Sequence, residues 1–436
     1  MIVRTAFAGL VLAVALATSA QARQEPVLIY VVERGDTLYD LGQRGLTRPA
    51  DHRVVQRLNR IADPRRLRPG SRLRIPERLL RTEAIEARLG AFKGEVSLTS
   101  GDRTVPAAKG LAVREGDGLA TGANAFGRLD LPDGSRVTLP SQSRVRIVRL
   151  RRTLLTGGVQ REFLVEAGGG ASLVRPLRGP HDSYIVRTPM SVSAVRGTEF
   201  RVRFSDDGRR AATEVLEGSV EVSTGGDVET VAPAFARVST VDGPALTAPL
   251  PPPPALRRSD GLQDQPVLSF DVEPAANVRG YRAQIASDAG FVDVLADAEA
   301  TQPRLTFDAV ADGVYFVRAT VVDAQGLEGM PVVQAFERRL NTLTPRAPTQ
   351  ERGDGLRRFL FRWDVEGDGE RSYRFQIRRE GQDALPLIDQ AGLTETSIAL
   401  TDLPPGTYVW RVMSRTFVRG RYVEKWSAEQ RFETAL

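Results

Sequence analysis

Alternation of apolar and polar positions marks the chain from about residue 94 onward. In residues 128–131 and 136–139 every second position is apolar, and the four residues between them (PDGS) favour a hairpin turn. Further short β-branched runs, bounded by Gly and Asp, lie at residues 143–150, 162–166, 172–174, 183–188, 199–204, 212–216 and 219–223. Because no run of helical spacing interrupts them, we predict an all-β domain over residues 90–245.

Residues 28–76 show a different pattern, which predicts a strand, two helices and a closing strand. A β-rich run at residues 28–32 is followed by a Gly-Asp-Thr turn and by a helix expected over residues 38–44. Thr37 or Asp36 is placed to cap that helix by accepting a hydrogen bond from a free backbone amide.

The second helix of this region is predicted from apolar residues at helical spacing, namely Val54, Val55 and Leu58. Asp51 is placed to cap it, and residues 73–76 form the closing strand. A short helix over residues 84–88 is expected to lead out of the module.

The C-terminal part of the chain repeats itself at a spacing of about 92 residues. The run YRAQI at residue 281 corresponds to YRFQI at residue 373, and GVYFVR at residue 313 corresponds to GTYVWR at residue 406. Short strands with core aromatic residues at this spacing predict two β-sandwiches, at residues 263–342 and 352–436. The proline-rich residues 246–262 are expected to be a stiff, extended linker.

Residues 1–22 have the pattern of a cleaved secretion signal, with a basic start, an apolar stretch and a small-residue end (Ala20-Gln21-Ala22). The apolar stretch is about 12 residues long, whereas a bilayer core needs about 20. No later apolar run approaches that length, so we expect an exported chain without a transmembrane segment.

Composition removes several classes of function. The 436 residues include no cysteine and only two histidines, which excludes disulfides, thiolate zinc sites, a cysteine nucleophile and a multi-histidine metal centre. The glycine run at residues 168–170 is no phosphate loop, because no strand–helix context or Lys-Ser/Thr follows it. We therefore predict a multidomain, mainly β protein that is not an enzyme and has no catalytic residue, metal or cofactor.

Positive charge concentrates in the N-terminal module. Residues 27–81 hold 13 arginines and 6 acidic residues, and five arginines lie close together: Arg65, Arg66, Arg68, Arg72 and Arg74. Such a patch attracts polyanions over long range. In an exported protein we expect anionic envelope polymers rather than nucleic acid as its partners. The alternative is a merely solvated basic face.

Two motifs of the N-terminal module resemble the LysM domain. They are YVVERGDTL, which begins at residue 30, and the run that begins with LNRI at residue 58 and ends with RIP at residue 76. The resemblance implies a βααβ module at residues 27–80 that binds N-acetylglucosamine-containing glycans such as peptidoglycan. The family's binding groove maps onto two loops. The first loop consists of Gly35, Asp36, Thr37 and Leu38, and the second consists of Ile61, Ala62, Asp63 and Pro64. Backbone groups there would hold the acetamido arms, while Leu38, Ile61 and Pro64 would offer apolar platforms. Alternatively, these residues serve only the turn, the cap and the core.

Three motifs of the β domain resemble the FecR domain, namely LPDGSRVTL at residue 131, RTPMSVSAVRGTEF at 187 and VLEGSVEV at 215. The resemblance implies an all-β fold and a protein-binding surface. The signalling role of family members does not transfer, because we expect neither their membrane helix nor their cytoplasmic segment here. The two C-terminal repeats resemble fibronectin type III domains.

Together these features predict a secreted, periplasmic, non-catalytic scaffold that binds peptidoglycan and presents its β domains to unidentified envelope proteins. One alternative is a FecR-like sensor of an envelope or metal-uptake signalling system that acts through a membrane partner. A wall hydrolase or its activator is a further alternative, although no paired-carboxylate motif is recognisable.

Overall fold

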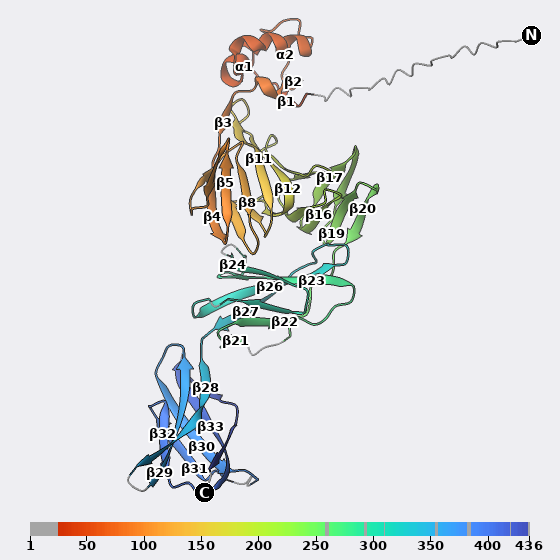
Figure 1. The fold of residues 1–436 in the computed structure, drawn as a ribbon. Helices are drawn as coiled ribbons and strands as arrows, with labels where there is room; N and C mark the ends of the chain where they lie inside the picture. The colour runs from red at the N-terminus through yellow and green to blue at the C-terminus, as the bar shows by residue number, and fades with distance from the viewer. Residues whose placement is uncertain are drawn as a thin grey trace, which may run out of the picture. The chain divides into compact units, whose positions relative to one another are not determined.

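The computed structural model describes residues 25–257, 261–291, 294–308, 310–353, 356–381, 385–418 and 420–434, and strands predominate (Figure 1). The contacts divide the chain into two compact units. One unit is Met1–Ile85 with Arg151–Gln160 and Gly179–Asp182, and the other holds the rest. The predicted secretion signal, residues 1–22, lies outside the described residues.

The first unit contains the predicted strand, two helices and closing strand. Its elements are β1 (Val27–Val31), α1 (Leu38–Gly45), the 3-10 turn η1 (Pro49–Asp51), α2 (His52–Leu58) and β2 (Arg72–Pro76). β1 and β2 pair antiparallel, with Tyr30 opposite Leu73. The helices bury Leu41 and Val55 against this pair. The predicted order of elements is confirmed.

Helix capping in this unit was only partly predicted. The Thr37 side chain accepts a hydrogen bond from the Asp40 N–H (3.1 Å), which confirms Thr37 as the cap of α1. The prediction that Asp51 caps α2 is wrong, because its side chain makes no capping hydrogen bond. Asp51 already has helical backbone angles at the end of η1, so the chain enters α2 without a separate capping residue.

The predicted helix over residues 84–88 is also wrong. This segment ends β3 (Thr82–Ala84) and begins β4 (Ala87–Lys93). Ala87 and Leu89 are fully buried and Arg88 between them is exposed, which is the two-residue period of a strand.

Most of the large β domain, which we define by its strands β4 to β20, lies in the second unit; Arg151–Gln160 and Gly179–Asp182 belong to the first. Its longest sheet has the order β4–β9–β10–β12–β15–β16–β19–β20. The bounds are β9 (Phe126–Asp130), β10 (Arg136–Leu139), β12 (Val159–Leu173), β15 (Glu199–Phe204), β16 (Arg210–Glu217), β19 (Phe235–Thr240) and β20 (Gly243–Pro249). The predicted hairpin is confirmed, with Val137 opposite Leu129.

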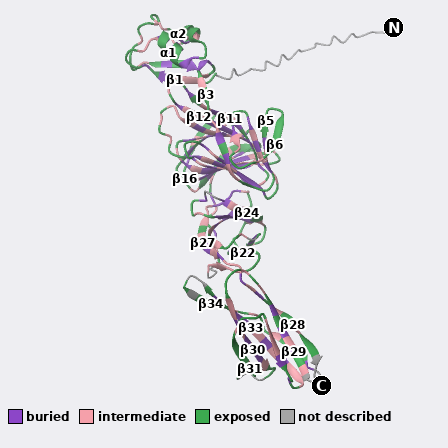
Figure 2. Ribbon diagram, turned by 90° about the vertical axis from the view of Figure 1, so that its left-hand side faces the viewer, coloured by how far each residue is buried: buried purple, intermediate pink, exposed green. Residues whose placement is uncertain are grey.

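The remaining strands of the large β domain form smaller antiparallel sets, and buried residues run along its strands (purple in Figure 2). β6, β5, β8 and β11 pair in that order, and so do β13, β14, β17 and β18. Their bounds are β5 (Val96–Ser100), β6 (Arg103–Pro106), β8 (Gly118–Thr121), β11 (Arg144–Thr153), β13 (Ser183–Arg187), β14 (Val192–Val195), β17 (Val220–Thr224) and β18 (Asp227–Val231), with β7 (Ala112–Val113) beside β4.

Two strands predicted separately, residues 162–166 and 172–174, are largely one continuous strand, β12. Gly168 lies between them with a φ of +69°, and a Cβ there would collide with the Gln142 carbonyl oxygen. A glycine therefore lets the strand bend without breaking.

The two predicted C-terminal sandwiches are present, and each packs two sheets around an apolar core. In the first, β21 (Leu262–Gln263), β27 (Val332–Arg338), β26 (Gly313–Asp323), β23 (Val278–Ala286) and β24 (Val294–Ala300) face β22 (Leu268–Asp271) and β25 (Arg304–Phe307). In the second, β28 (Thr342–Gly353), β29 (Leu356–Glu366) and β32 (Ser397–Thr401) face β31 (Ile388–Leu393), β30 (Arg371–Arg379), β33 (Gly406–Val418), β34 (Arg421–Trp426) and β35 (Gln430–Thr434). The second sandwich begins with β28 at Thr342, ten residues before the predicted start at 352.

The proline-rich segment, predicted as an extended linker over residues 246–262, is instead packed against its neighbours. Its first residues complete β20, which pairs with β19. Leu250 is buried in an apolar cluster with Leu327 of the first sandwich, and the Met330 N–H donates to the Pro251 carbonyl oxygen (2.8 Å). These contacts hold the segment between the large β domain and the first sandwich.

A buried cluster of charges also joins the large β domain to the first sandwich. Arg201 on β15 pairs with Glu214 on β16 (2.7 Å) and with Glu328, which follows β26 (2.9 Å). Glu328 also pairs with Arg203 and with Arg282 of β23 (3.0 Å), and its N–H donates to Glu214 (2.9 Å). Burial by itself raises the pKa of the Glu328 carboxyl, but the guanidinium groups of Arg201, Arg282 and Arg203 hold that pKa well below its ordinary 4.5.

Replacing Glu328 by Gln is expected to destabilise this junction by about 3–5 kcal/mol, because Arg203 loses its carboxylate and three guanidinium groups are left with only Glu214 and Asp297. Hydrogen exchange of β15 and β26 is the suitable measurement. Tryptophan fluorescence would not report on this junction, because all three tryptophans lie in the second sandwich. Because folding lowers the pKa of Glu328, its contribution is present above about pH 4.5 and is lost as the pH falls toward the folded-state value. The wild type should therefore lose protection in acid, and E328Q should lack that part of the pH dependence.

The matched control is D242N, which breaks the exposed Arg209–Asp242 pair (2.7 Å). This variant should change the free energy of opening, measured by hydrogen exchange, by less than about 1 kcal/mol. Wild-type protection in E328Q would contradict a structural role for the buried cluster.

Candidate functional site

The two loops predicted to form a site lie side by side in the first unit. The Leu38 N–H, at the end of the first loop, donates a hydrogen bond to the Pro64 carbonyl oxygen in the second loop (2.9 Å). The fold thus brings together residues 35–38 and residues 61–64, as a two-loop site requires.

Asp36 organises the first loop. Its carboxylate accepts hydrogen bonds from the Tyr30 hydroxyl (2.8 Å) and the Glu33 N–H (2.8 Å), and it pairs with Arg44 (2.6 Å). Burial, reinforced by the hydrogen bond to Asp36, raises the pKa of Tyr30 to about 12. With its side chain only 6% exposed, Asp36 shapes the loop rather than facing a ligand. Gly35 precedes it with a φ of +95°, a left-handed turn that favours glycine.

Thr37 and Leu38 are also engaged within the fold. Besides accepting from the Asp40 N–H, the Thr37 hydroxyl donates to the Asp40 carboxylate (2.7 Å). Leu38 is 1% exposed and packs in the core with Leu41 and Val55. The expectation that the Leu38 side chain offers an apolar platform to a sugar is therefore wrong, because the core already buries it.

The second loop supplies the accessible surface. Ala62 and Asp63 are exposed, while Ile61 and Pro64 are half-buried. The Ile61 N–H donates to the Gln56 carbonyl oxygen (3.0 Å), which ties the loop to the end of α2. The Asp63 carboxylate accepts from the Arg65 N–H (2.9 Å) and closes a local turn.

Tyr39 is an exposed aromatic residue that the sequence reasoning missed. It follows Leu38 in the first turn of α1, and 59% of it is exposed. Its ring meets His52 edge-on at a centroid distance of 6.2 Å, and its hydroxyl accepts from the Gln43 side chain (3.0 Å). The helical spacing of the apolar residues could have predicted this exposure. Because α1 buries Leu38 and Leu41, the Tyr39 side chain lies on its outer face.

The arginines of the predicted basic patch are all exposed, namely Arg65, Arg66, Arg68, Arg72 and Arg74. Arg72 and Arg74 lie on the outer face of β2, opposite Val31 and Ile29 of β1. The patch is therefore open to solvent and to any polyanion.

Comparison with family models gives two matches, each to part of the chain. Residues 30–76 match the LysM domain, and residues 117–221 match the FecR protein family. The chain carries a LysM domain and a FecR domain. The FecR match lies within the large β domain, which we call the FecR domain from here on. Both resemblances drawn from the motifs are confirmed, and both loops of the candidate site lie inside the LysM match. Neither family is catalytic, and no curated protein matches the chain.

Solved structures are similar to parts of the chain only. Two crystal structures of a putative anti-sigma factor from Parabacteroides distasonis ATCC 8503 are 22% identical, with a TM-score of 0.26. The match covers 30% of this chain and 59% of that one. The human OSCAR ligand-binding domain is 16% identical over 42% of this chain and 99% of its own, with a TM-score of 0.17.

Within the described ranges, no helix has the length and apolar character needed to cross a membrane. The same ranges hold no group of three or more His, Asp or Glu residues arranged to take a metal ion.

Replacing Asp36 by Ala is expected to destabilise the LysM domain by about 2–3 kcal/mol, because the Tyr30 hydroxyl and the Glu33 N–H lose their acceptor and Arg44 loses its partner. Hydrogen exchange of β1 and β2 in the full chain measures this effect. D51A is the control, since the Asp51 side chain makes no capping hydrogen bond, and it should change protection by less than about 0.5 kcal/mol. Equal protection in both variants would show that Asp36 does not organise the loop.

Proposed function

We propose that this protein is a secreted, non-catalytic scaffold of the periplasm that binds peptidoglycan through its LysM domain. The FecR domain and the two sandwiches, which we take to be fibronectin type III-like, present surfaces to other envelope proteins. The observation that carries the proposal is the hydrogen bond from Leu38 to Pro64, because it joins the two loops that a glycan must contact together.

In this proposal the predicted site residues divide into two groups. The first group holds the first loop in shape. Gly35 makes the turn and the Asp36 carboxylate accepts hydrogen bonds, while Thr37 caps the helix and the Leu38 side chain packs in the core. Ile61, Ala62, Asp63 and Pro64 form the second loop, whose exposed part faces the acetamido arms of the sugar. The exposed ring of Tyr39 is a candidate apolar platform in place of Leu38.

Modest affinity for each glycan site is sufficient for this role. A wall polymer repeats the same sugar unit many times, so the effective concentration of binding sites near an attached protein is high. The exposed arginine patch adds a long-range attraction to anionic envelope polymers, which salt weakens. The loops and the patch therefore differ in their response to ionic strength.

A second candidate function is a sensor that acts through a membrane partner. It is favoured by the match to the FecR family and by the buried charges that fix the FecR domain to the first sandwich. Loss of a transcriptional response on disrupting the FecR domain, with wall binding intact, would support the sensor over the scaffold.

Co-sedimentation of the full chain with purified peptidoglycan sacculi tests the proposal. We expect binding to persist at 0.5 M NaCl and to be competed by soluble N-acetylglucosamine oligomers. Ala62→Glu should weaken binding about tenfold or more, because it places a charged side chain on the exposed second loop without disturbing the core. Tyr39→Ala should weaken it more moderately.

The matched control is Ala84→Glu, the same change at an exposed position on β3, outside the LysM match. It should bind sacculi like the wild type. Loss of all wild-type binding at 0.5 M NaCl would instead assign the contact to the arginine patch and refute the two-loop site.

A further inference from the structure

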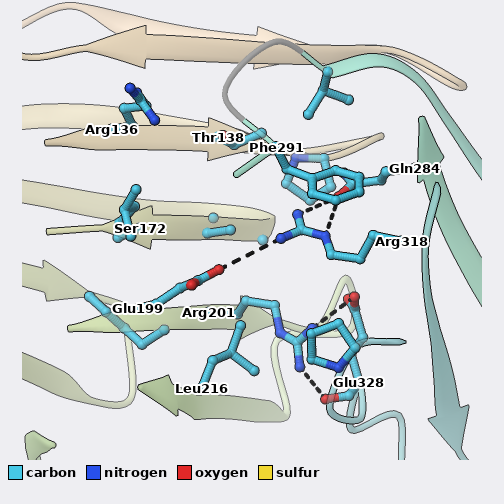
Figure 3. A pocket seen from close by; sticks show the side chains of 18 of the residues that line it. Arg136, Thr138, Ser172, Glu199, Arg201, Leu216, Gln284, Phe291, Arg318 and Glu328 are labelled. Carbon is cyan, nitrogen blue, oxygen red and sulfur yellow. Dashed lines mark hydrogen bonds and ion pairs between the residues drawn. The ribbon is translucent and has the colours of Figure 1, made fainter. Parts of the chain in front are cut away.

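A cavity of about 260 Å³ lies between the FecR-domain sheet and the first sandwich, within the second unit (Figure 3). Its floor is the outer face of β10, β12 and β15, where Thr138 lies opposite Ala171 and Ala171 lies opposite Arg201. Gly169 adds a position with no side chain. Small residues in the middle of a sheet face leave the space that larger ones would fill.

Alternation along β12 shows which side chains face the cavity. Ser172 accepts from the buried Tyr184 hydroxyl (3.1 Å), and a Cβ on Gly170 would point at Val165. Both positions therefore face the interior of the FecR domain. Ala171, between them, faces the cavity.

The first sandwich supplies the roof through Phe291, Gln284 and Arg318. The Arg318 guanidinium stacks on the Phe291 ring at 4.5 Å from its centroid and donates to the Gln284 side-chain oxygen (2.5 Å). Its carboxylate partner, Glu199, is farther away, at 3.6 Å. Burial lowers the pKa of Arg318, and Glu199 opposes that effect only in part.

Positive charge is in excess around this cavity. Arg128 and Arg136 share a single carboxylate, Asp130, at 2.9 Å and 3.8 Å. The buried Nη1 atom of Arg128 has no hydrogen-bond partner among the described residues. With Arg318 and Glu199 included, three guanidinium groups face two carboxylates.

The deeper arginines do not add to this excess. Arg201, Arg203 and Arg282 are matched by Glu214, Glu328 and Asp297. A further anion is therefore accommodated by Arg128 and Arg136 rather than by the buried cluster.

We propose that this cavity binds a small organic carboxylate. Its anionic end pairs with Arg128 and Arg136, and its apolar body lies over Thr138 and Ala171, beneath Phe291. Guanidinium groups suit carboxylates because their N–H groups form paired, charge-assisted hydrogen bonds. A cavity of about 150 Å³ holds benzene, so this one has room for about ten to twelve non-hydrogen atoms. This site is separate from glycan binding by the LysM domain.

Isothermal titration of the full chain with benzoate, phenylacetate and 3-phenylpropanoate tests the site, with neutral benzamide as the uncharged probe. We expect at least one carboxylate to bind with one-to-one stoichiometry and benzamide to bind at least tenfold more weakly. Arg136→Gln should weaken binding about tenfold or more. Ala171→Leu should abolish it by filling the floor while leaving every charge in place.

Arg144→Gln, which removes an exposed arginine of β11 outside the cavity, is the matched control and should bind like the wild type. Sacculus binding should be unchanged in all three variants, which separates this test from that of the LysM domain. The proposal is overturned if none of the three carboxylates binds, if benzamide binds equally well, or if Ala171→Leu retains binding.

Discussion

Glu328 places one carboxylate, itself almost fully buried, among the guanidinium groups of Arg201, Arg203 and Arg282. Two of these arginines belong to the FecR domain, and Glu328 and Arg282 belong to the first sandwich. A charge in such a place is tolerated only when it is paired and hydrogen-bonded. The two domains therefore cannot separate without exposing or orphaning several charges, and the cavity beside them depends on the same contact.

The LysM domain is organised on a more local scale. Asp36 collects hydrogen bonds from residues three to eight positions away along the chain, and Thr37 caps the helix that follows. One longer-range hydrogen bond, from Leu38 to Pro64, then brings the second loop alongside. Local hydrogen bonding thus shapes the first loop, and tertiary contacts, this hydrogen bond and the packing of Ile61 against the core, place the second loop beside it.

Much of the fold was predictable because its signals are local. The PDGS hairpin, the cap at Thr37 and the repeated strands of the two sandwiches all follow from residue spacing. Two of the errors arise where tertiary contacts decide. The proline-rich segment is packed because Leu250 finds an apolar cluster, and Leu38 is unavailable to a ligand because the core takes its side chain.

The two sandwiches separate these contributions most clearly. Spacing alone determines a shared polar ladder, in which Arg282 and Gln284 hydrogen-bond Asp297, just as Arg374 and Gln376 hydrogen-bond Asp389. Only the tertiary structure decides what covers each ladder: the Arg282 side chain is 8% exposed beside the FecR domain, whereas that of Arg374 is 42% exposed. Cross-strand hydrogen bonds depend on residues within one sheet, but burial depends on a domain far away in the sequence.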